Sequence, residues 1–272
     1  MRKNFCGWYY KCQSDTQTLA VIPATHGDRQ SVQIITDSGV WTFSENLENC
    51  LFGSDGFRLN LYENGVSAVG EVRFSGLTPL KNDIMGPFKF VPFMQCRHSV
   101  VSMRHRVDGE IIINGEKYSF SDGLGYIEGD RGFSFPSKYL WTQSFFGGGS
   151  LMLSVADIPF AGRHFPGVIA AVLLNGKEYR LATYLGARAV EIADGKAVIR
   201  QGGYTLSARL IEMRARALKA PVSGSMVRTV HESPSCRAAY RFEKNGKILL
   251  ELQTDRASFE YEYGGENEQI SK

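Results

Sequence analysis

Short runs of alternating apolar and polar residues, separated by tight-turn dipeptides, extend along the whole chain. One pair of runs, Glu110–Ile113 and Lys117–Phe120, flanks Asn114-Gly115. Asn-Gly and Asp-Gly accept the positive φ angles that a two-residue hairpin turn requires. These dipeptides occur at Asn64-Gly65, Asn114-Gly115, Asn175-Gly176, Asn245-Gly246, Asp55-Gly56, Asp108-Gly109, Asp122-Gly123 and Asp194-Gly195. The pattern predicts β-hairpins that follow one another in sequence.

Closely spaced turns and 29 glycines are typical of an antiparallel sandwich or barrel, and not of alternating β-α-β units. We therefore predict an all-β fold with little helix. One segment, Tyr204–Ala220, lacks Gly and Pro and permits two interpretations. Its apolar positions at helical spacing are Leu206, Leu210, Met213 and Ala217. Leu206, Ala208 and Leu210 also alternate as in a strand. We favour a strand there, with a helix as the alternative.

Two aromatic stretches resemble each other and divide the chain. Gly7–Lys11 and Tyr139–Gln143 each place a tryptophan on an aromatic run that could open a barrel. We therefore predict two barrel-like lobes, residues 1–124 and 125–272, which meet near Gly125. One continuous sandwich is the alternative.

The composition predicts a folded, soluble chain. Its 272 residues are 43% apolar, which is ample for a packed core. The 31 basic and 28 acidic residues are interspersed and leave a net charge of +3, which argues against nucleic acid as a partner. No apolar run approaches the roughly 20 residues of a membrane-spanning helix, and the N-terminal residues do not form a secretory leader. We expect a cytoplasmic protein.

The five cysteines are scattered and odd in number, which indicates reduced thiols without disulfides. They are Cys6, Cys12, Cys50, Cys96 and Cys236. None of their spacings is C-x-x-C, so we expect no metal site.

Candidate chemistry is concentrated between Met94 and Gln143. In a strand over 96–107, His98 lies on one face and His105 on the other, because side chains alternate. The two histidines are therefore poor joint metal ligands. The alternative for each is a hydrogen-bonded histidine without a chemical role.

A second candidate strand, Gly125–Gly132, places Tyr126, Glu128 and Asp130 on one side. The Cα atoms of Glu128 and Asp130 would lie roughly 6.6 Å apart, and two full charges at that distance repel by about 2.5 kcal/mol at an effective dielectric near 20. Burial beside aromatic residues would add to this cost, so that one carboxyl stays protonated near neutral pH. The alternative is a salt bridge from either carboxylate to Arg131 or Arg104. Nucleophile-elbow, phosphate-loop and dinucleotide motifs are absent from the sequence.

Several of these segments closely resemble the tocopherol cyclase-like family. The resemblance covers nearly the whole chain and is carried by Phe5–Lys11, Pro92–His105, Gly125–Pro136, Trp141–Gln143 and Leu218–Arg228. The family is similar to lipocalin-like proteins that include carotenoid hydratases and fungal cyclases. The resemblance implies two lipocalin-like antiparallel β-barrel lobes around a lipophilic cavity. Cys6 and Arg131 depart from the family pattern, and Arg131 could lower the pKa of Asp130 and weaken it as an acid.

The family reaction implied is the addition of a hydroxyl across a prenyl double bond without a redox cofactor. It implies Glu128 as the acid, His98 as a base or orienting group and Asp130 in support. The residues expected to contact the substrate are Tyr126, Trp141, Gln143, Trp8, His105 and Ser134. The expected partner is a lipophilic small molecule, with no transmembrane segment, no metal and at most transient contact with a membrane surface. The oligomeric state is not determined.

Two other functions fit the same residues. A non-catalytic carrier or sensor would use the barrel and its aromatic lining, with the carboxylates orienting a ligand. A purely structural domain would use the glycine, proline and aromatic residues to join its two lobes.

Overall fold

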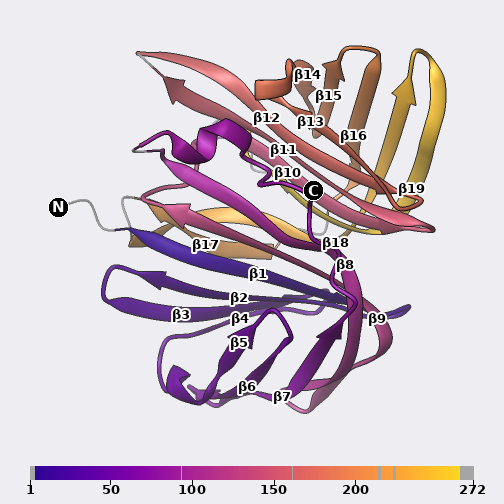
Figure 1. Cartoon of the computed structure of the whole chain (residues 1–272). Coiled ribbons are helices and arrows are strands. Elements are labelled where there is room, and N and C mark those ends of the chain that lie inside the picture. The colour runs from indigo at the N-terminus through magenta and orange to yellow at the C-terminus, as the bar shows by residue number, and fades with distance from the viewer. Residues whose placement is uncertain (1–3, 93, 161, 214–215, 223–224, 264–272) are drawn as a thin grey trace.

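The chain folds into two curled antiparallel sheets, which form half-barrel-like lobes stacked on each other (Figure 1). The computed structural model describes residues 4–92, 94–160, 162–213, 216–222 and 225–263. Within these ranges there is no α-helix, and three short 3-10 helices occur: η1 (Leu47–Asn49), η2 (Gly86–Phe90) and η3 (Thr183–Leu185). The prediction of an all-β, two-lobed fold is confirmed.

The first sheet has nine strands and contains the N-terminal part of the chain. Its spatial order is β4 (Val40–Phe43), β3 (Arg29–Thr36), β2 (Thr18–His26), β1 (Phe5–Gln13), β9 (Glu116–Gly132), β8 (Cys96–Ile113), β7 (Val66–Ser75), β6 (Gly56–Glu63) and β5 (Leu51–Gly53).

The second sheet has ten strands. Nine of them follow the order β13 (Lys177–Ala182), β12 (Arg163–Leu174), β11 (Gly149–Phe160), β10 (Tyr139–Phe146), β19 (Lys247–Tyr261), β18 (Ser225–Lys244), β16 (Tyr204–Glu212), β15 (Lys196–Gln201) and β14 (Arg188–Ala193). The remaining strand, β17 (Arg216–Val222), pairs with β18.

The two sheets repeat one connectivity. In each sheet the first strand in sequence pairs with the last, β1 with β9 and β10 with β19. The two tryptophan-containing stretches are therefore central strands at equivalent positions. Gly125–Gly132 belongs to β9, so the chain passes to the second sheet between Gly132 and Tyr139, later than the predicted boundary after residue 124.

Most of the predicted turns connect strands, but two do not. Asn64, Asn114, Asn175, Asp194 and Asn245 all have positive φ at hairpin turns. Asp108-Gly109 and Asp122-Gly123, in contrast, lie inside β8 and β9, where the pairing register shifts. The prediction of hairpins was wrong at these two places, because a positive φ also suits a β-bulge. The two dipeptides lie opposite each other at one register shift, which allows β8 and β9 to continue as one long ribbon.

The segment with two interpretations forms strands over most of its described residues. Tyr204–Glu212 is strand β16 and Arg216–Val222 is strand β17, as favoured above. Leu206 and Ala208 are both buried. Alternate positions thus face the core, and the helical spacing of the apolar residues was incidental.

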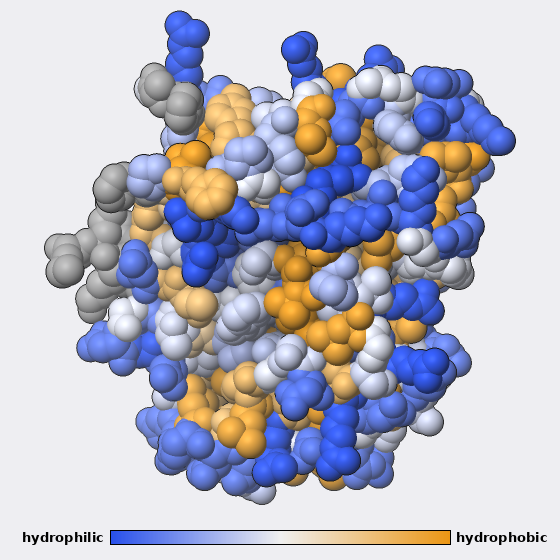
Figure 2. All heavy atoms as spheres, viewed as in Figure 1, coloured by the Kyte–Doolittle hydropathy of each residue, from blue (hydrophilic) through white to orange (hydrophobic). Residues whose placement is uncertain are grey.

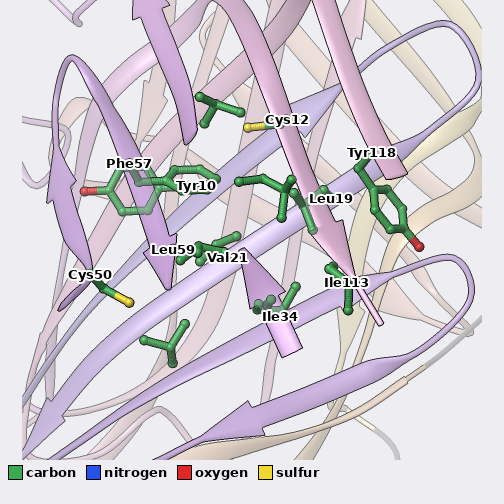
Figure 3. Packing of buried hydrophobic residues seen from close by; sticks show 14 of the residues in the cluster. Tyr10, Cys12, Leu19, Val21, Ile34, Cys50, Phe57, Leu59, Ile113 and Tyr118 are labelled. Carbon is green, nitrogen blue, oxygen red and sulfur yellow. The ribbon is translucent and has the colours of Figure 1, made fainter. Parts of the chain in front are cut away.

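Each lobe has its own apolar core, and a third cluster joins them. The first lobe packs residues such as Tyr10, Leu19 and Ile34 (Figure 3). The cluster between the lobes combines Tyr9 and Tyr126 of the first sheet with Trp141 of the second. Burial of large aromatic side chains from both sheets fixes the lobes against each other.

The connection between β7 and β8, which are neighbours in the first sheet, packs against the second lobe. Phe88 of η2 packs edge-on against Tyr184, with ring centroids 6.1 Å apart. Arg180 donates hydrogen bonds to the carbonyl oxygens of Asn82 and Asp83, at 2.6 and 2.7 Å. These contacts hold the connection beside the second sheet.

Hydrophilic side chains cover much of the face seen in Figure 2, with apolar residues gathered at mid-height between the lobes. Among the described residues, no helix has the length and apolar character needed to cross a membrane. All five cysteines are free thiols.

Candidate active site between the lobes

A cavity of about 410 Å³ lies between the two lobes. Its walls come from both sheets and from the connection that contains η2. Apolar walls are formed by Trp8, Met85, Phe88, Met94, Phe133, Phe135, Trp141, Ile158, Phe165 and Leu218, among others. Polar groups enter from only a few positions, which include His98, Glu128, Asp130, Glu232 and Glu260. An apolar pocket with a few convergent polar groups is the usual form of a small-molecule site.

His98 lies between two carboxyl groups on the first-sheet wall. The antiparallel register of β8 and β9 places His98 opposite Asp130. The Nδ1 atom of His98 lies 3.1 Å from Oδ1 of Asp130, and its Nε2 atom lies 3.2 Å from Oε2 of Glu128. The second contact has the distance of an ion pair without hydrogen-bond geometry, since Nε2 has no hydrogen-bond partner. The structure thus unites the three predicted catalytic residues.

Glu128 is buried and accepts hydrogen bonds from two aromatic side chains. The Tyr126 hydroxyl donates to Oε2 at 2.5 Å, and Nε1 of Trp141 donates to the same oxygen at 3.1 Å. Trp141 belongs to β10, so this contact joins the two sheets. Burial and the adjacent Glu128 raise the pKa of Tyr126 well above its usual range, which keeps its hydroxyl a donor.

Asp130 receives its hydrogen bonds from the first sheet. Its Oδ1 atom lies 3.2 Å from the thiol of Cys96, in addition to its contact with His98. Arg131 is exposed, as expected for the next residue of a strand. Arg104 donates instead to the backbone oxygens of Phe146 and Gly149. The salt bridges considered as the alternative for these carboxylates are therefore replaced by pairing with His98.

The charges around His98 determine its protonation. Burial alone lowers the pKa of His98, but the carboxylates of Glu128 and Asp130 raise it well above its ordinary value. The imidazole is therefore protonated at neutral pH. The three groups together carry one net negative charge when both carboxyls are ionised.

A second pair of acids, absent from the predicted set, lies on the second-sheet wall. Glu232 of β18 is paired in register with Glu260 of β19. Tyr9 donates to Oε1 of Glu232 at 2.5 Å, and Tyr139 donates to Oε2 of Glu260. Both glutamates lie in strands far from the dense central segment, so no local sequence signal connects them with it.

The remaining predicted contact residues divide into two groups. Trp8 and Trp141 line the cavity. Tyr126 is fully buried behind Glu128, and Gln143 is fully buried, where its Oε1 accepts a hydrogen bond from Lys11 at 3.0 Å. Ser134 bonds to the backbone oxygen of Phe135. These last three side chains are not among the residues that line the cavity.

His105 lies apart from the cavity, within the first lobe. Its ring packs on Phe74 with centroids 4.4 Å apart, and its Nδ1 atom lies 3.1 Å from the Ser102 hydroxyl. Burial lowers its pKa to about 4, so it is neutral at pH 7. The pairing register of β8 with β9 shifts on both sides of Ser102, between His98 and His105. These irregularities accompany the different placement of the two histidine side chains.

The first-sheet wall carries three side chains of types that can bind a metal ion. One ligand atom each from His98, Glu128 and Asp130 lie within 4.8 Å of one another. Both ring nitrogens of His98, however, already face a carboxylate oxygen. A metal cation bound to either nitrogen would displace one of these contacts. The arrangement therefore suits a protonated imidazole better than a bound metal ion.

The fold and cavity together define a class, lipocalin-like β proteins of two lobes with a largely apolar cavity between them. The crystal structure of CghA shares the fold with a TM-score of 0.59 and 11% identity, over 97% of this chain and 90% of CghA. CghA with Sch210972 matches with a TM-score of 0.59 and 10% identity, over 96% of this chain and 88% of that one. A Nitrosomonas europaea protein assigned as an AttH matches with a TM-score of 0.52 and 10% identity, over 97% and 93% of the two chains.

At these identities the likeness establishes the fold alone. No family model matches the chain, and no curated protein matches it. Membership in the tocopherol cyclase-like family therefore stays a prediction from the central motif.

Proposed function

We propose that the protein is a tocopherol cyclase-like enzyme, a cofactor-free cyclase or hydratase. It adds a hydroxyl group across a double bond of a prenylated or other lipophilic molecule. The main supporting observation is the Glu128–His98–Asp130 cluster at the wall of an otherwise apolar, aromatic-lined cavity of about 410 Å³. Proton transfer in such a cavity is favoured because little water competes with the bound substrate.

Addition of a hydroxyl to an alkene requires one proton to reach carbon and another to leave oxygen. The intermediate cation is stabilised by aromatic faces, which Trp8, Tyr9 and Trp141 provide along the cavity wall. With both carboxyls ionised, the net negative charge of the His98 cluster would stabilise the same cation. The substrate hydroxyl, or water in a hydratase, then forms the new carbon–oxygen bond.

The hydrogen bonds favour a role for Glu128 other than the acid implied by the family resemblance. Two donors, Tyr126 and Trp141, converge on Oε2, and His98 faces the same oxygen. A carboxylate is an acceptor only, so this environment suits the ionised form. We assign Glu128 the acceptance of the hydroxyl proton, with the His98 imidazolium compensating its charge and Asp130 orienting His98.

Glu128→Gln tests this assignment. The amide retains the size and an acceptor oxygen but loses the charge, so turnover of an ortho-prenylated hydroquinone should fall by about 100-fold or more. Binding of the same compound, followed by quenching of tryptophan fluorescence, should change little. Glu116→Gln, at the exposed start of the same strand, is the matched control and should retain the wild-type rate. Full activity of Glu128→Gln would remove the cluster from the reaction.

The second candidate function is a carrier of a lipophilic ligand. It is favoured by the predominance of aromatic and aliphatic side chains in the cavity walls. For a carrier, native mass spectrometry of the purified protein should show a bound lipid that is recovered unaltered after incubation.

A further inference from the structure

The second-sheet wall of the cavity carries a buried acid for which the mechanism above has no role. Glu232 is 1% exposed and lines the cavity opposite the first-sheet wall that carries His98, Glu128 and Asp130. It projects from β18, the counterpart in the second lobe of β8, which carries His98.

Tyr9 fixes the position of Glu232 relative to the aromatic walls. Its hydroxyl donates to Oε1 of Glu232 at 2.5 Å and also lies 3.2 Å from the Ser258 hydroxyl. The Tyr9 ring packs edge-on against Trp141, with centroids 5.3 Å apart, and Trp141 in turn donates to Glu128. One chain of contacts thus connects the acids of the two walls.

We propose that Glu232 is a further catalytic residue of this site, the general acid that protonates the double bond of the substrate. This inference rests on the proposed function. It assigns the two proton transfers to opposite walls. Glu232 of the second lobe donates a proton to the alkene, and Glu128 of the first lobe accepts the proton of the hydroxyl.

The steps balance in protons and electrons. The O–H bond of Glu232 breaks, and its proton forms a C–H bond with the π electron pair of the alkene, which leaves a carboxylate and a tertiary cation. A lone pair of the hydroxyl forms the C–O bond, and the hydroxyl proton passes to Glu128. Between turnovers Glu128 releases one proton to solvent and Glu232 takes one up, so the net reaction is an isomerisation, or a hydration if water adds.

Burial and the charges on neighbouring elements together set the pKa of Glu232. Burial, with a smaller contribution from repulsion by Glu128, raises the pKa of Glu232 to about 7. The hydrogen bond from Tyr9 and the charge of Lys11 act in the opposite direction and lower this pKa. Glu260, on the adjacent strand, also has a raised pKa, from burial and from the charge of Glu232. A carboxyl that is half protonated near neutrality is well matched to general acid catalysis.

Glu232→Gln tests the proposal with an ortho-prenylated hydroquinone as the probe. We expect turnover to fall by about 100-fold. We also expect the wild-type rate to decline as pH rises through about 7, where Glu232 loses its proton, and the residual rate of Glu232→Gln to lack this decline. Glu243→Gln, on the same strand in a surface pair with Arg241, is the matched control and should retain both the rate and the pH profile.

The wild type, Glu128→Gln and Glu232→Gln together distinguish a failure of the acid assignment from a failure of the proposed function. If the wild type is active, Glu128→Gln is inactive and Glu232→Gln keeps the rate and the pH profile, the acid assignment is overturned while the proposed function stands. A wild type that converts no ortho-prenylated hydroquinone removes the proposed function and this inference with it. Circular dichroism and probe binding verify folding, and Glu232→Asp replaces Glu232→Gln if the latter does not fold. Its shorter acid should reduce the rate while the decline with pH remains.

Discussion

Buried ionisable residues distinguish this molecule from a simple apolar barrel. His98 and Glu232 line the cavity, whereas Lys11 is fully buried and is not among the lining residues. The Lys11 ammonium donates to Oε1 of Gln143 and to the backbone oxygen of Arg256, at 3.0 and 3.1 Å. Because Lys11 belongs to β1 and both acceptors belong to the second sheet, this one cation joins the lobes.

Lys11 should make the stability of the protein depend on pH. Burial lowers the pKa of Lys11 from 10.5 to about 7, against attraction to acids such as Glu232. Between these values the unfolded chain binds more protons than the folded one, so stability rises with pH. Urea titrations of the wild type and of Lys11→Met give the difference between their free energies of unfolding. We expect this difference, wild type minus variant, to increase by about 3 kcal/mol from pH 7 to 9.5.

The matched control is Lys117→Met, because the side chain of Lys117 is 56% exposed. The corresponding difference for this control should stay nearly constant over the same range. A constant difference for Lys11→Met as well would show that Lys11 is not desolvated in the folded protein.

At the scale of elements, the long ribbon of β8 and β9 builds the first-sheet wall of the site. Its register sets His98 opposite Asp130 and Val100 opposite Glu128. Glycines in β9 leave room for neighbouring rings, since a Cβ atom added at Gly129 would lie 2.7 Å from the ring of Trp8. The shape of the cavity wall therefore depends on the absence of a side chain at this position.

Gly129→Ala should alter the cavity more than the fold. The new methyl group must displace the Trp8 ring, which lines the cavity, so we expect weaker binding of the hydroquinone by about 10-fold and a loss of stability below about 2 kcal/mol. Gly147→Ala is the control, because a Cβ atom there meets nothing within 4 Å. Isothermal calorimetry and thermal melts measure the two effects. Unchanged affinity in Gly129→Ala would mean that Trp8 does not contact the ligand.

The sequence predicted those parts of the site that depend on a single strand. The period of two correctly placed Tyr126 and Glu128 on one side of β9, and the hydrogen bond between them follows from that placement. Glu232 and Glu260 could not be found in this way, because their proximity to Glu128 depends on how the lobes pack. A different limit applies to Asp108-Gly109 and Asp122-Gly123, since an Asp-Gly pair signals a bulge and a hairpin equally.

At the scale of the whole molecule, two sheets of one connectivity enclose the site at their junction (Figure 1). Each lobe closes its own core and contributes one wall with acidic groups. The connection containing η2 contributes Met85 and Phe88 to the cavity and is held by the second lobe. Chemistry at such a junction requires both lobes, so neither lobe alone is expected to act on a substrate.

The most direct test of this function is to follow deuterium from solvent into an ortho-prenylated hydroquinone. After incubation of the wild-type protein in D₂O, mass spectrometry should detect a cyclised or hydrated product that carries one non-exchangeable deuterium on carbon. Glu128→Gln and Glu232→Gln should yield little of it. Recovery of the compound intact and without deuterium after incubation with the wild-type protein would contradict proton-transfer catalysis and indicate a carrier.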